Sequence, residues 1–171
     1  MKKEICLFDY AGKICEALKA GVLLTTKSKD TVNTMTIGWG SVGIEWGLPV
    51  FTAYVRESRF TRQLLDESGE FTVNISLTAP DKKVIAVCGT KSGREVDKIS
   101  ELGLTLEEPA VISVPGIREF PLTLECRVLL RNVQEERRLP ENVQQRFYSA
   151  INAGDYHIAY YGEILKAYLI E

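Results

Sequence analysis

The chain has 171 residues, of which 45% are hydrophobic and 26% are charged, and its formal net charge at pH 7 is -2. This length is typical of one globular unit with its own core, so we expect a single domain over residues 1–171. The charge provides no broad positive field for nucleic acid, so any phosphate recognition has to be local. No apolar run approaches the roughly 18 residues of a membrane span, and we expect no membrane partner.

The first residues and the cysteines favour a cytoplasmic protein. Asp9, Lys13 and Glu16 interrupt the apolar stretch that a signal peptide would need. The four cysteines lie far apart, without a C-x-x-C pair, at Cys6, Cys15, Cys88 and Cys126. We expect reduced thiols that are mostly buried, and we expect no metal site, because the single histidine has no cluster of ligands beside it.

In chain order, the first half of the chain favours strands with one helix among them. The strand patterns cover residues 21–26, 33–40, 50–55 and 71–76. In the last of these, apolar residues alternate strictly on one face. The helix lies between the last two strands: Ser58 can cap its N-terminus, and Gly69 can end it.

The second half of the chain alternates helices, loops and two long strands. Asp81 opens a helix that Gly89 ends, and Pro140 begins another with apolar residues at spacings of four. Loops are indicated at 92–94 and 113–116, and strands at 122–130 and 156–170. Single helices between many strands favour a mainly β fold with inserted helices, an antiparallel barrel rather than a doubly wound sheet.

The first segment that can carry chemistry covers residues 33–40, which read N-T-M-T-I-G-W-G. Asn33 and Thr36 can supply donors and acceptors to a planar polar heterocycle, and Met35 and Trp39 can supply apolar contacts. The alternative is a plain barrel strand with a tryptophan in the core.

The second segment is the junction between the strand at 50–55 and the following helix, R-E-S-R-F-T at 56–61. It gathers two guanidinium groups and two hydroxyls where the first helical N–H groups have no intrahelical partner, which suits a dianion such as phosphate. Arg56, Arg59 and Arg62 would repel one another without an anion, because only Glu57 opposes them locally. The alternative is a capped surface helix with solvated arginines.

The third segment, residues 88–98, is a polar loop between two helices, with Asp97 and Lys98 in the turn that follows it. Taken alone, it is typical of a solvated loop, and Lys98 of a surface lysine paired with Asp97 or Glu95. Cys88 lies near a helix C-terminus, which does not stabilise a thiolate, so a structural role is favoured.

In this order and spacing, three motifs resemble the flavin reductase-like family of FMN-binding split barrels, in the branch that includes flavoredoxin. They are N-T-M-T-I-G-W at 33–39, R-E-S-R-F-T at 56–61 with G-E-F-T-V-N at 69–74, and S-G-R-E-V-D-K at 92–98. The resemblance spans roughly residues 10–170. It implies an antiparallel split β-barrel and a homodimer with FMN near the subunit interface.

The resemblance also implies one group of cofactor contacts for each motif. Those along the isoalloxazine and ribityl part are Asn33, Met35, Thr36 and Trp39, with Thr34 also in the cofactor-binding set. Those at the phosphate are Arg56, Ser58, Arg59 and Thr61. Those in the second loop are Ser92, Gly93, Arg94 and Lys98. A positive charge of Lys98 near the pyrimidine side would raise the flavin reduction potential.

We therefore expect an FMN-dependent oxidoreductase that transfers electrons between NAD(P)H or a redox partner and an acceptor, with no catalytic residue indicated. One alternative is a pure electron carrier. The other is a non-catalytic split barrel that binds haem or another ligand, in which haem would depend on His157, a cysteine or a tyrosine. His157 lies at the mouth of the last strand, where we expect a surface residue; the alternative is a contact with the flavin or a substrate.

Overall fold

The computed structural model describes all residues from Met1 to Glu171. Its strands are β1 (Lys2–Glu4), β2 (Val22–Ser28), β3 (Thr31–Ile37), β4 (Gly40–Glu45), β5 (Leu48–Arg56), β6 (Glu70–Ile75), β7 (Leu106–Glu107), β8 (Gly116–Ile117), β9 (Leu122–Val133) and β10 (His157–Ile170). Its helices are α1 (Leu7–Ala20), α2 (Phe60–Ser68), α3 (Lys82–Thr90), α4 (Lys98–Leu102) and α5 (Glu141–Phe147), with short 3-10 turns η1 (Glu136–Arg138) and η2 (Ala150–Asn152). The mainly β composition with inserted helices is confirmed.

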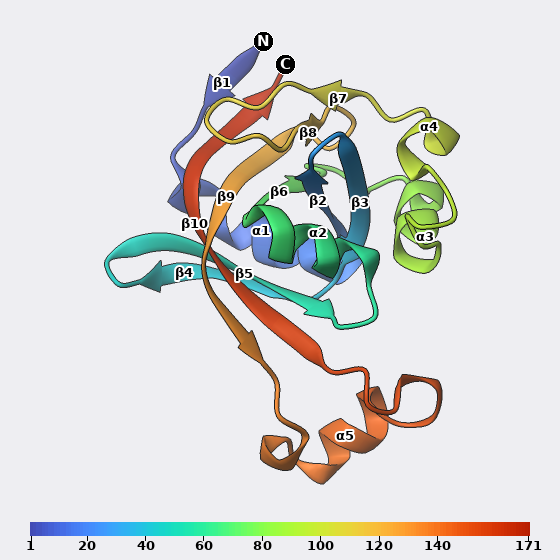
Figure 1. Ribbon diagram of the computed structural model, residues 1–171. Helices are drawn as coiled ribbons and strands as arrows, with labels where there is room; N and C mark the ends of the chain where they lie inside the picture. Colours follow the sequence, from blue (N-terminus) through green and yellow to red (C-terminus); the bar gives the residue numbers. More distant parts are fainter.

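The main sheet runs in the order β3-β2-β6-β9-β10-β5-β4, with every neighbouring pair antiparallel, and β1 also pairs with β10 (Figure 1). This is the antiparallel split barrel expected from the sequence. Gly162 lies at a register shift between β9 and β10, and a Cβ there would come within 2.5 Å of the Phe71 ring. The missing side chain therefore lets β10 close over the barrel core.

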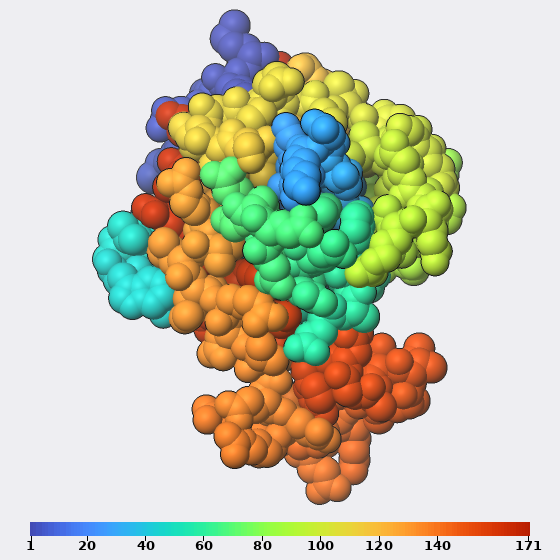
Figure 2. All heavy atoms as spheres, in the orientation of Figure 1, coloured from blue at the N-terminus to red at the C-terminus, as the bar shows by residue number.

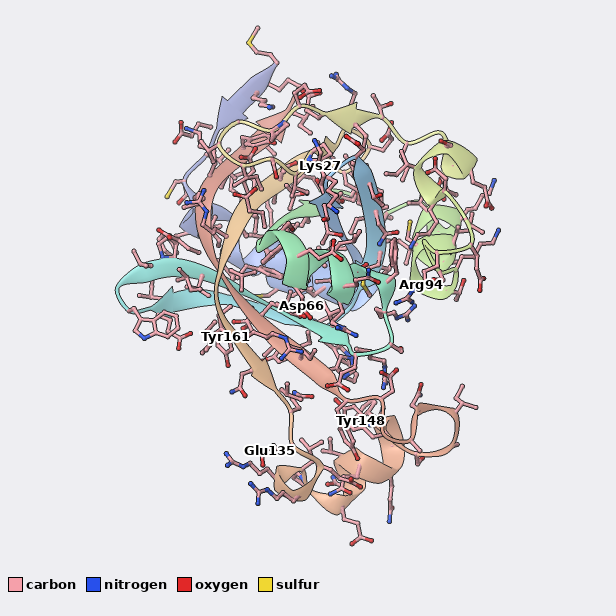
Figure 3. The ribbon with its side chains drawn as sticks, in the orientation of Figure 1. Lys27, Asp66, Arg94, Glu135, Tyr148 and Tyr161 are labelled. Atoms are coloured by element: carbon pink, nitrogen blue, oxygen red, sulfur yellow. The ribbon has the colours of Figure 1, made fainter.

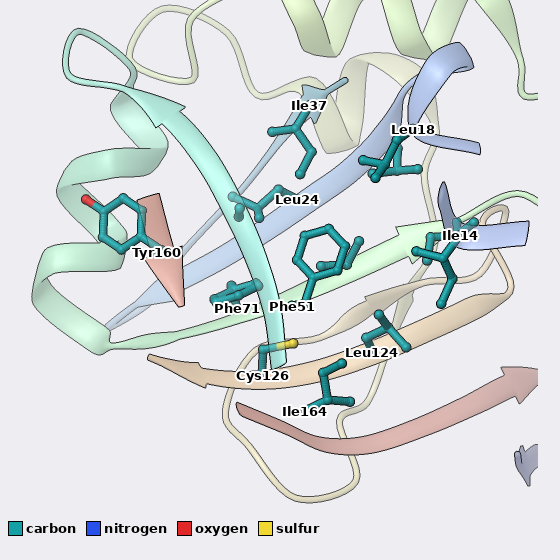
Figure 4. Packing of buried hydrophobic residues seen from close by; sticks show 14 of the residues in the cluster. Ile14, Leu18, Leu24, Ile37, Phe51, Phe71, Leu124, Cys126, Tyr160 and Ile164 are labelled. Atoms are coloured by element: carbon teal, nitrogen blue, oxygen red, sulfur yellow. The ribbon is translucent and has the colours of Figure 1, made fainter. Parts of the chain in front are cut away.

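The barrel core is one cluster of 21 buried side chains, to which α1 contributes Ile14 and Leu18. Figure 4 shows both residues beside Phe51 and Leu124, which point into the same space. Phe71 belongs to this cluster, as the alternation of its strand predicts. The other face of β6 is also buried, and it carries Thr72 and Asn74. Buried polar groups need partners, and these two donate to the carbonyl of Pro115 and the hydroxyl of Thr25.

Glu125 of β9 is a fully buried carboxylate, and the chain itself supplies its partners. Its oxygens accept from the backbone N–H groups of Ala110, Val111 and Ile112 at 2.6, 2.7 and 3.2 Å. They also accept from the hydroxyl of Tyr168 at 2.9 Å. The carboxylate thus holds the segment before β8 onto the barrel, and burial beside this negative charge raises the pKa of Tyr168.

A projecting arm, residues 134–156, connects β9 to β10 and carries η1, α5 and η2 (Figure 1; orange to orange-red in Figure 2). The helix expected after Pro140 is confirmed, but it ends at Phe147. Ile151 lies in η2 with 97% of its surface exposed, so the apolar spacing does not continue a buried helical face that far.

The expectation that the cysteines are mostly buried is half wrong. All four are free thiols, and Cys88 and Cys126 are buried, but Cys6 and Cys15 are exposed. Cys15 lies on the outer side of α1 because Ile14 and Leu18 occupy the side that packs on the barrel. None of the helices has the length and apolar character needed to cross a bilayer.

Candidate functional site

A cleft of about 560 Å³ lies between the β5–α2 junction, the loop from α3 to α4, and the arm. It brings together residues from all three sequence motifs, which lie in separate parts of the chain. The predicted site residues that line it are Asn33, Met35, Arg56, Ser58, Arg59, Thr61, Ser92, Gly93, Arg94 and Lys98.

The prediction that Ser58 caps α2 is wrong. The helix begins at Phe60, and the residue at its N-cap position is Arg59, whose side chain makes no capping hydrogen bond. Ser58 instead donates from its backbone N–H and its hydroxyl to the carboxylate of Asp155, at 2.9 and 2.8 Å. A capping serine accepts from the first helical N–H groups, whereas Ser58 donates to a carboxylate of the arm. Hydrogen bonds to an ionised acceptor are stronger than those between neutral groups, so these two bonds hold Ser58 toward the arm.

Two of the three arginines of this junction have partners within the chain. Arg56 donates to the backbone carbonyls of Asp155 and Phe147, at 2.7 and 3.0 Å, and so ties the arm to β5. Arg62 pairs with Asp66 one turn along α2, at 3.2 Å. Besides Glu57, the local carboxylate, Asp66 and Asp155 from outside the motif therefore also oppose these charges.

Arg59 is the arginine that the chain leaves without a partner. Its half-buried guanidinium lines the cleft, and it makes neither a side-chain hydrogen bond nor an ion pair. Burial lowers its pKa, and the positive charge of Arg56 adds to this effect while Asp155 opposes it. A desolvated cation facing a cleft is suited to an anionic ligand.

Gly93 allows the α3–α4 loop to reach β3 and α2. A Cβ on Gly93 would lie 2.1 Å from Oδ1 of Asn33 and 2.9 Å from the ring of Phe60. Asn33 in turn donates from Nδ2 to the hydroxyl of Thr61 at 2.8 Å. Through these contacts the three motifs meet in one place, and only glycine fits at this approach.

Arg94 lies at the rim of the same cleft, and Figure 3 labels it near the β5–α2 junction. Its guanidinium donates to the carbonyl oxygen of Ser58 at 3.2 Å and lies 5.1 Å from the ring centroid of Phe60. These contacts use part of its donor set and leave it with no carboxylate partner, so it adds positive charge to the cleft.

Lys98 is not the surface lysine that its loop alone would favour. It is only 4% exposed, its Nζ donates to the carbonyl of Lys91 at 3.2 Å, and it has no ion pair. Asp97, the expected partner, accepts instead from the first N–H groups of α4. Burial lowers the pKa of Lys98, Cys88 opposes that change, and Arg59 adds to it.

A second compartment of about 200 Å³ adjoins the cleft and shares Met35, Arg56 and Arg59 with it. Thr36 and Trp39 lie here rather than in the main cleft. Trp39 is 40% exposed, which excludes the alternative of a core tryptophan. Its ring contacts Phe147 of the arm at a centroid distance of 5.0 Å, so this compartment is aromatic where the cleft is cationic.

Thr34 is the one predicted site residue that the structure brings into neither the cleft nor the second compartment. Its side chain is buried between strands, where its hydroxyl accepts from Thr25 at 3.1 Å and donates to the carbonyl of Leu24 at 3.4 Å. It lies between Asn33 and Met35, and the alternation of β3 turns its side chain to the opposite face from theirs.

His157 is buried, so the expectation of a surface histidine is wrong. It is 7% exposed, its Nδ1 lies 2.7 Å from the hydroxyl oxygen of Tyr148, and its ring lies 4.6 Å from Trp39. Burial, with further contributions from Arg56 and Arg59, lowers its pKa to about 4, although Asp155 opposes them.

The arm contributes site residues that none of the three motifs predicts. Phe147, Tyr148 and Asp155 belong to the arm, and each contacts a residue of the site. The pairing of β10 with β5 brings them there, because it sets His157 opposite Arg56. The residues just before β10 therefore lie beside the β5–α2 junction. No local sequence pattern reveals this pairing.

The structure is a split barrel that carries a cationic cleft and, adjoining it, a compartment lined by the aromatic rings of Trp39, Tyr54 and His157. The sequence matches the family model described as "Flavin reductase like domain" over residues 17–171. The chain belongs to this flavin reductase-like family.

Solved structures and a curated relative are similar to this chain. Flavoredoxin of Desulfovibrio vulgaris (Miyazaki F) has a TM-score of 0.66 at 22% identity, covering 88% of this chain and 69% of that one. Flavoredoxin from Methanosarcina acetivorans has a TM-score of 0.64 at 28% identity, covering 88% and 68%. An uncharacterized protein of Archaeoglobus fulgidus is 36% identical over 97 residues, which is 57% of this chain and 54% of that protein. The match thus spans about half the length of this curated relative.

Proposed function

We propose that this chain binds FMN in the cleft and its adjoining compartment, and works as an oxidoreductase between NAD(P)H or a redox partner and an acceptor. The observation that carries the proposal is the unpartnered guanidinium of Arg59, which borders both spaces. A ligand with an anion at one end and a planar ring at the other matches the two compartments. Bound FMN would supply hydride and electron transfer through its ring.

The residues at the cleft suit a phosphate. Arg59 stands at the start of α2, where the first backbone N–H groups have no intrahelical partner, and Arg94 and Lys98 add positive charge. Thr61 accepts from Asn33 and keeps its own proton free to donate. We assign Arg56 to the arm rather than to the phosphate, because its terminal nitrogens already donate to backbone carbonyls.

The residues of the second compartment suit a ring. Met35 and Trp39 offer apolar surface, and His157 offers one ring nitrogen. With the phosphate at Arg59, a ring in this compartment would be shielded on one side by Trp39, and the arm would limit its access to water. The chain's own contribution is therefore binding, orientation and exclusion of water.

The visible spectrum of purified protein tests cofactor and reaction together. We expect flavin absorption, or its appearance after FMN is added, and bleaching on addition of NADH or NADPH without oxygen. Protein that shows no flavin absorption and takes up no FMN would contradict the proposal. A haem-type spectrum would favour the non-catalytic alternative.

A pure electron carrier is distinguished in the same apparatus. Flavin that stays oxidised with both nicotinamides, but is bleached by a reduced redox protein, would identify a carrier. The name flavoredoxin, which two of the similar structures carry, supports keeping the carrier as the second candidate.

We further propose a homodimer in the cytoplasm. Large apolar side chains are exposed on the β4–β5 hairpin and on the outer part of β9, namely Ile44, Trp46, Leu129, Leu130 and Val133. Such a surface suits burial against a second copy, and four free thiols suit a reducing compartment. Light scattering of the FMN-loaded protein should give twice the mass of the chain, and a monomer would contradict the dimer.

A further inference from the structure

His157 is the only histidine of the chain, and its ring stands between the second compartment and the arm. On one side it contacts Trp39 in the lining of the compartment. On the other side its Nδ1 lies 2.7 Å from the hydroxyl oxygen of Tyr148. Figure 3 places Tyr148 where the arm meets the barrel. The arm therefore reaches the site through this pair.

A second partner of Tyr148 decides which group donates. The hydroxyl of Tyr148 donates to Oε1 of Gln134 at 2.8 Å, and an amide oxygen can only accept. A phenol has one proton, so with the Gln134 amide in this orientation the oxygen of Tyr148 accepts from His157. The neutral imidazole then carries its proton on Nδ1, and Nε2 carries the lone pair.

Nε2 is the ring nitrogen of His157 that has no hydrogen-bond partner in the chain, and His157 lines the second compartment. Every fully buried side-chain nitrogen or oxygen has a partner, so Nε2 is not fully buried, although the residue as a whole is only 7% exposed. The pKa of about 4 keeps the imidazole neutral, and the lone pair available, near neutral pH.

We propose that Tyr148, oriented by Gln134, is a positioning residue that holds His157 as a hydrogen-bond acceptor, and that this selects a ligand edge that carries an N–H donor. The inference rests on the proposed function for the source of that edge. The imide of a flavin pyrimidine ring and the carboxamide of a nicotinamide both have this chemistry.

Nitrogen NMR of ligand-free protein labelled with ¹⁵N-histidine tests the position of the proton. One histidine gives one imidazole, so the two ring nitrogens are assigned without overlap. We expect the proton on Nδ1 at pH 7. A proton on Nε2 in the unmodified protein would overturn the proposal.

Three variants test whether Tyr148 sets that proton. Tyr148→Phe leaves a buried Nδ1–H without an acceptor, so the proton should move to the accessible Nε2. Gln134→Leu frees the proton of Tyr148 for Nδ1 and should have the same result. Gln134→Glu keeps an acceptor and should keep Nδ1–H. A spectrum that stays unchanged in Tyr148→Phe would overturn the positioning role.

Tyr156→Phe is the matched control, because the ring of Tyr156 stacks on Tyr148 at a centroid distance of 4.8 Å, while the hydroxyl at Nδ1 of His157 is that of Tyr148. It should leave the imidazole spectrum as it is. A change as large as that in Tyr148→Phe would mean that packing of the arm, rather than the hydroxyl of Tyr148, sets the proton, and would also overturn the proposal.

Ligand titrations identify the edge that Nε2 accepts from. A shift of the Nε2 signal with FMN alone assigns the flavin imide, and in that case Tyr148→Phe should weaken FMN binding by about tenfold. A shift that requires NAD⁺ added to FMN-loaded protein assigns the carboxamide. Saturation with both ligands and no shift would overturn the acceptor role. Failure to bind FMN would overturn the proposed function and the ligand edge, whereas the ligand-free spectrum decides the role of Tyr148 independently.

Discussion

Glu125 in the barrel and Arg59 at the cleft are both charged groups withdrawn from bulk water, and they differ in where their partners come from. Three backbone N–H groups and the hydroxyl of Tyr168 surround the carboxylate of Glu125. The guanidinium of Arg59 has no hydrogen-bond or ion-pair partner in the chain, and Arg56 repels it. A charge that the fold already satisfies stabilises the fold, whereas one left without partners is free to bind a ligand. Mutation to alanine should therefore lower mainly the stability of the fold at Glu125 and mainly the affinity for the ligand at Arg59.

Glu125→Ala should have the largest effect on stability. It leaves three N–H groups and the hydroxyl of Tyr168 without their acceptor, so we expect the free energy of unfolding to fall by about 3 kcal/mol. Urea denaturation measures this loss. Glu108→Ala, at an exposed position of the same segment, is the control and should change stability little. Equal losses of unfolding free energy in Glu125→Ala and Glu108→Ala would contradict the anchoring role of the buried carboxylate.

Arg59→Ala should weaken binding without weakening the fold. Losing one charge-assisted contact to phosphate should raise the dissociation constant of FMN about 30-fold, which corresponds to about 2 kcal/mol. Unfolding of the ligand-free protein should stay unchanged, since the guanidinium has no partner to lose. Fluorescence titration with FMN and urea denaturation measure the two quantities.

Arg62→Ala is the control for Arg59, because Arg62 lies in the first turn of the helix that Arg59 precedes but pairs with Asp66. It should leave FMN affinity nearly unchanged. The hydride-transfer rate of Arg59→Ala saturated with FMN should also change little, because Arg59 is assigned to the anchored end of the ligand. A large loss of rate at saturation, with binding unchanged, would contradict this assignment.

Local sequence patterns predicted what depends on neighbours in the chain. The alternation of Phe71, Val73 and Ile75 indicates a strand with one face in the core, and these three side chains are in the barrel cluster. Asp81 has the residue type that caps helices, and its carboxylate accepts from the first N–H groups of α3. In both cases the partners are within a few residues, so the pattern contains the information.

The errors concern contacts between distant segments. Ser58 also has the residue type that caps helices, yet Asp155, almost a hundred positions away, takes its hydroxyl. His157 is buried because the arm folds back on it through Tyr148. The three motifs identified most of the cleft, but neither the arm nor the direction of its hydrogen bonds can be derived from residue type and spacing.

The aromatic compartment should give the protein a pH dependence that the cationic cleft does not. The pKa of His157 is lowered from 6.5 to about 4 in the folded chain. Between these values the unfolded chain binds more protons, so stability is complete above pH 6.5 and falls as the pH decreases toward 4. We expect a loss of about 1.5 kcal/mol over this range, after allowing for the solvent contact of Nε2.

The charged and titratable groups around His157 are Arg56, Arg59, Asp155 and Tyr148. Urea denaturation at a series of pH values should show the slope, and His157→Gln should remove it. The carboxyl groups whose pKa is lowered in the fold, Glu67, Glu70 and Asp97, lose their contributions mainly below about pH 4.5 and so leave the upper part of the range to the histidine. An unchanged slope in His157→Gln would place the titrating group elsewhere.

Lys98 should show the smallest effect, and it lies between the two cases of the comparison. The chain gives its ammonium one carbonyl partner and no counter-charge, so part of its charge remains for a ligand. Lys98→Met keeps an unbranched apolar stem and removes the charge. With FMN bound, we expect the midpoint potential to fall by about 20 mV, equivalent to roughly 1 kcal/mol for two electrons. Lys91→Met is the control, because Lys91 is exposed and pairs with Glu101 at 2.6 Å. Equal potentials in Lys98→Met and the unmodified protein would assign Lys98, like Glu125, to the fold alone.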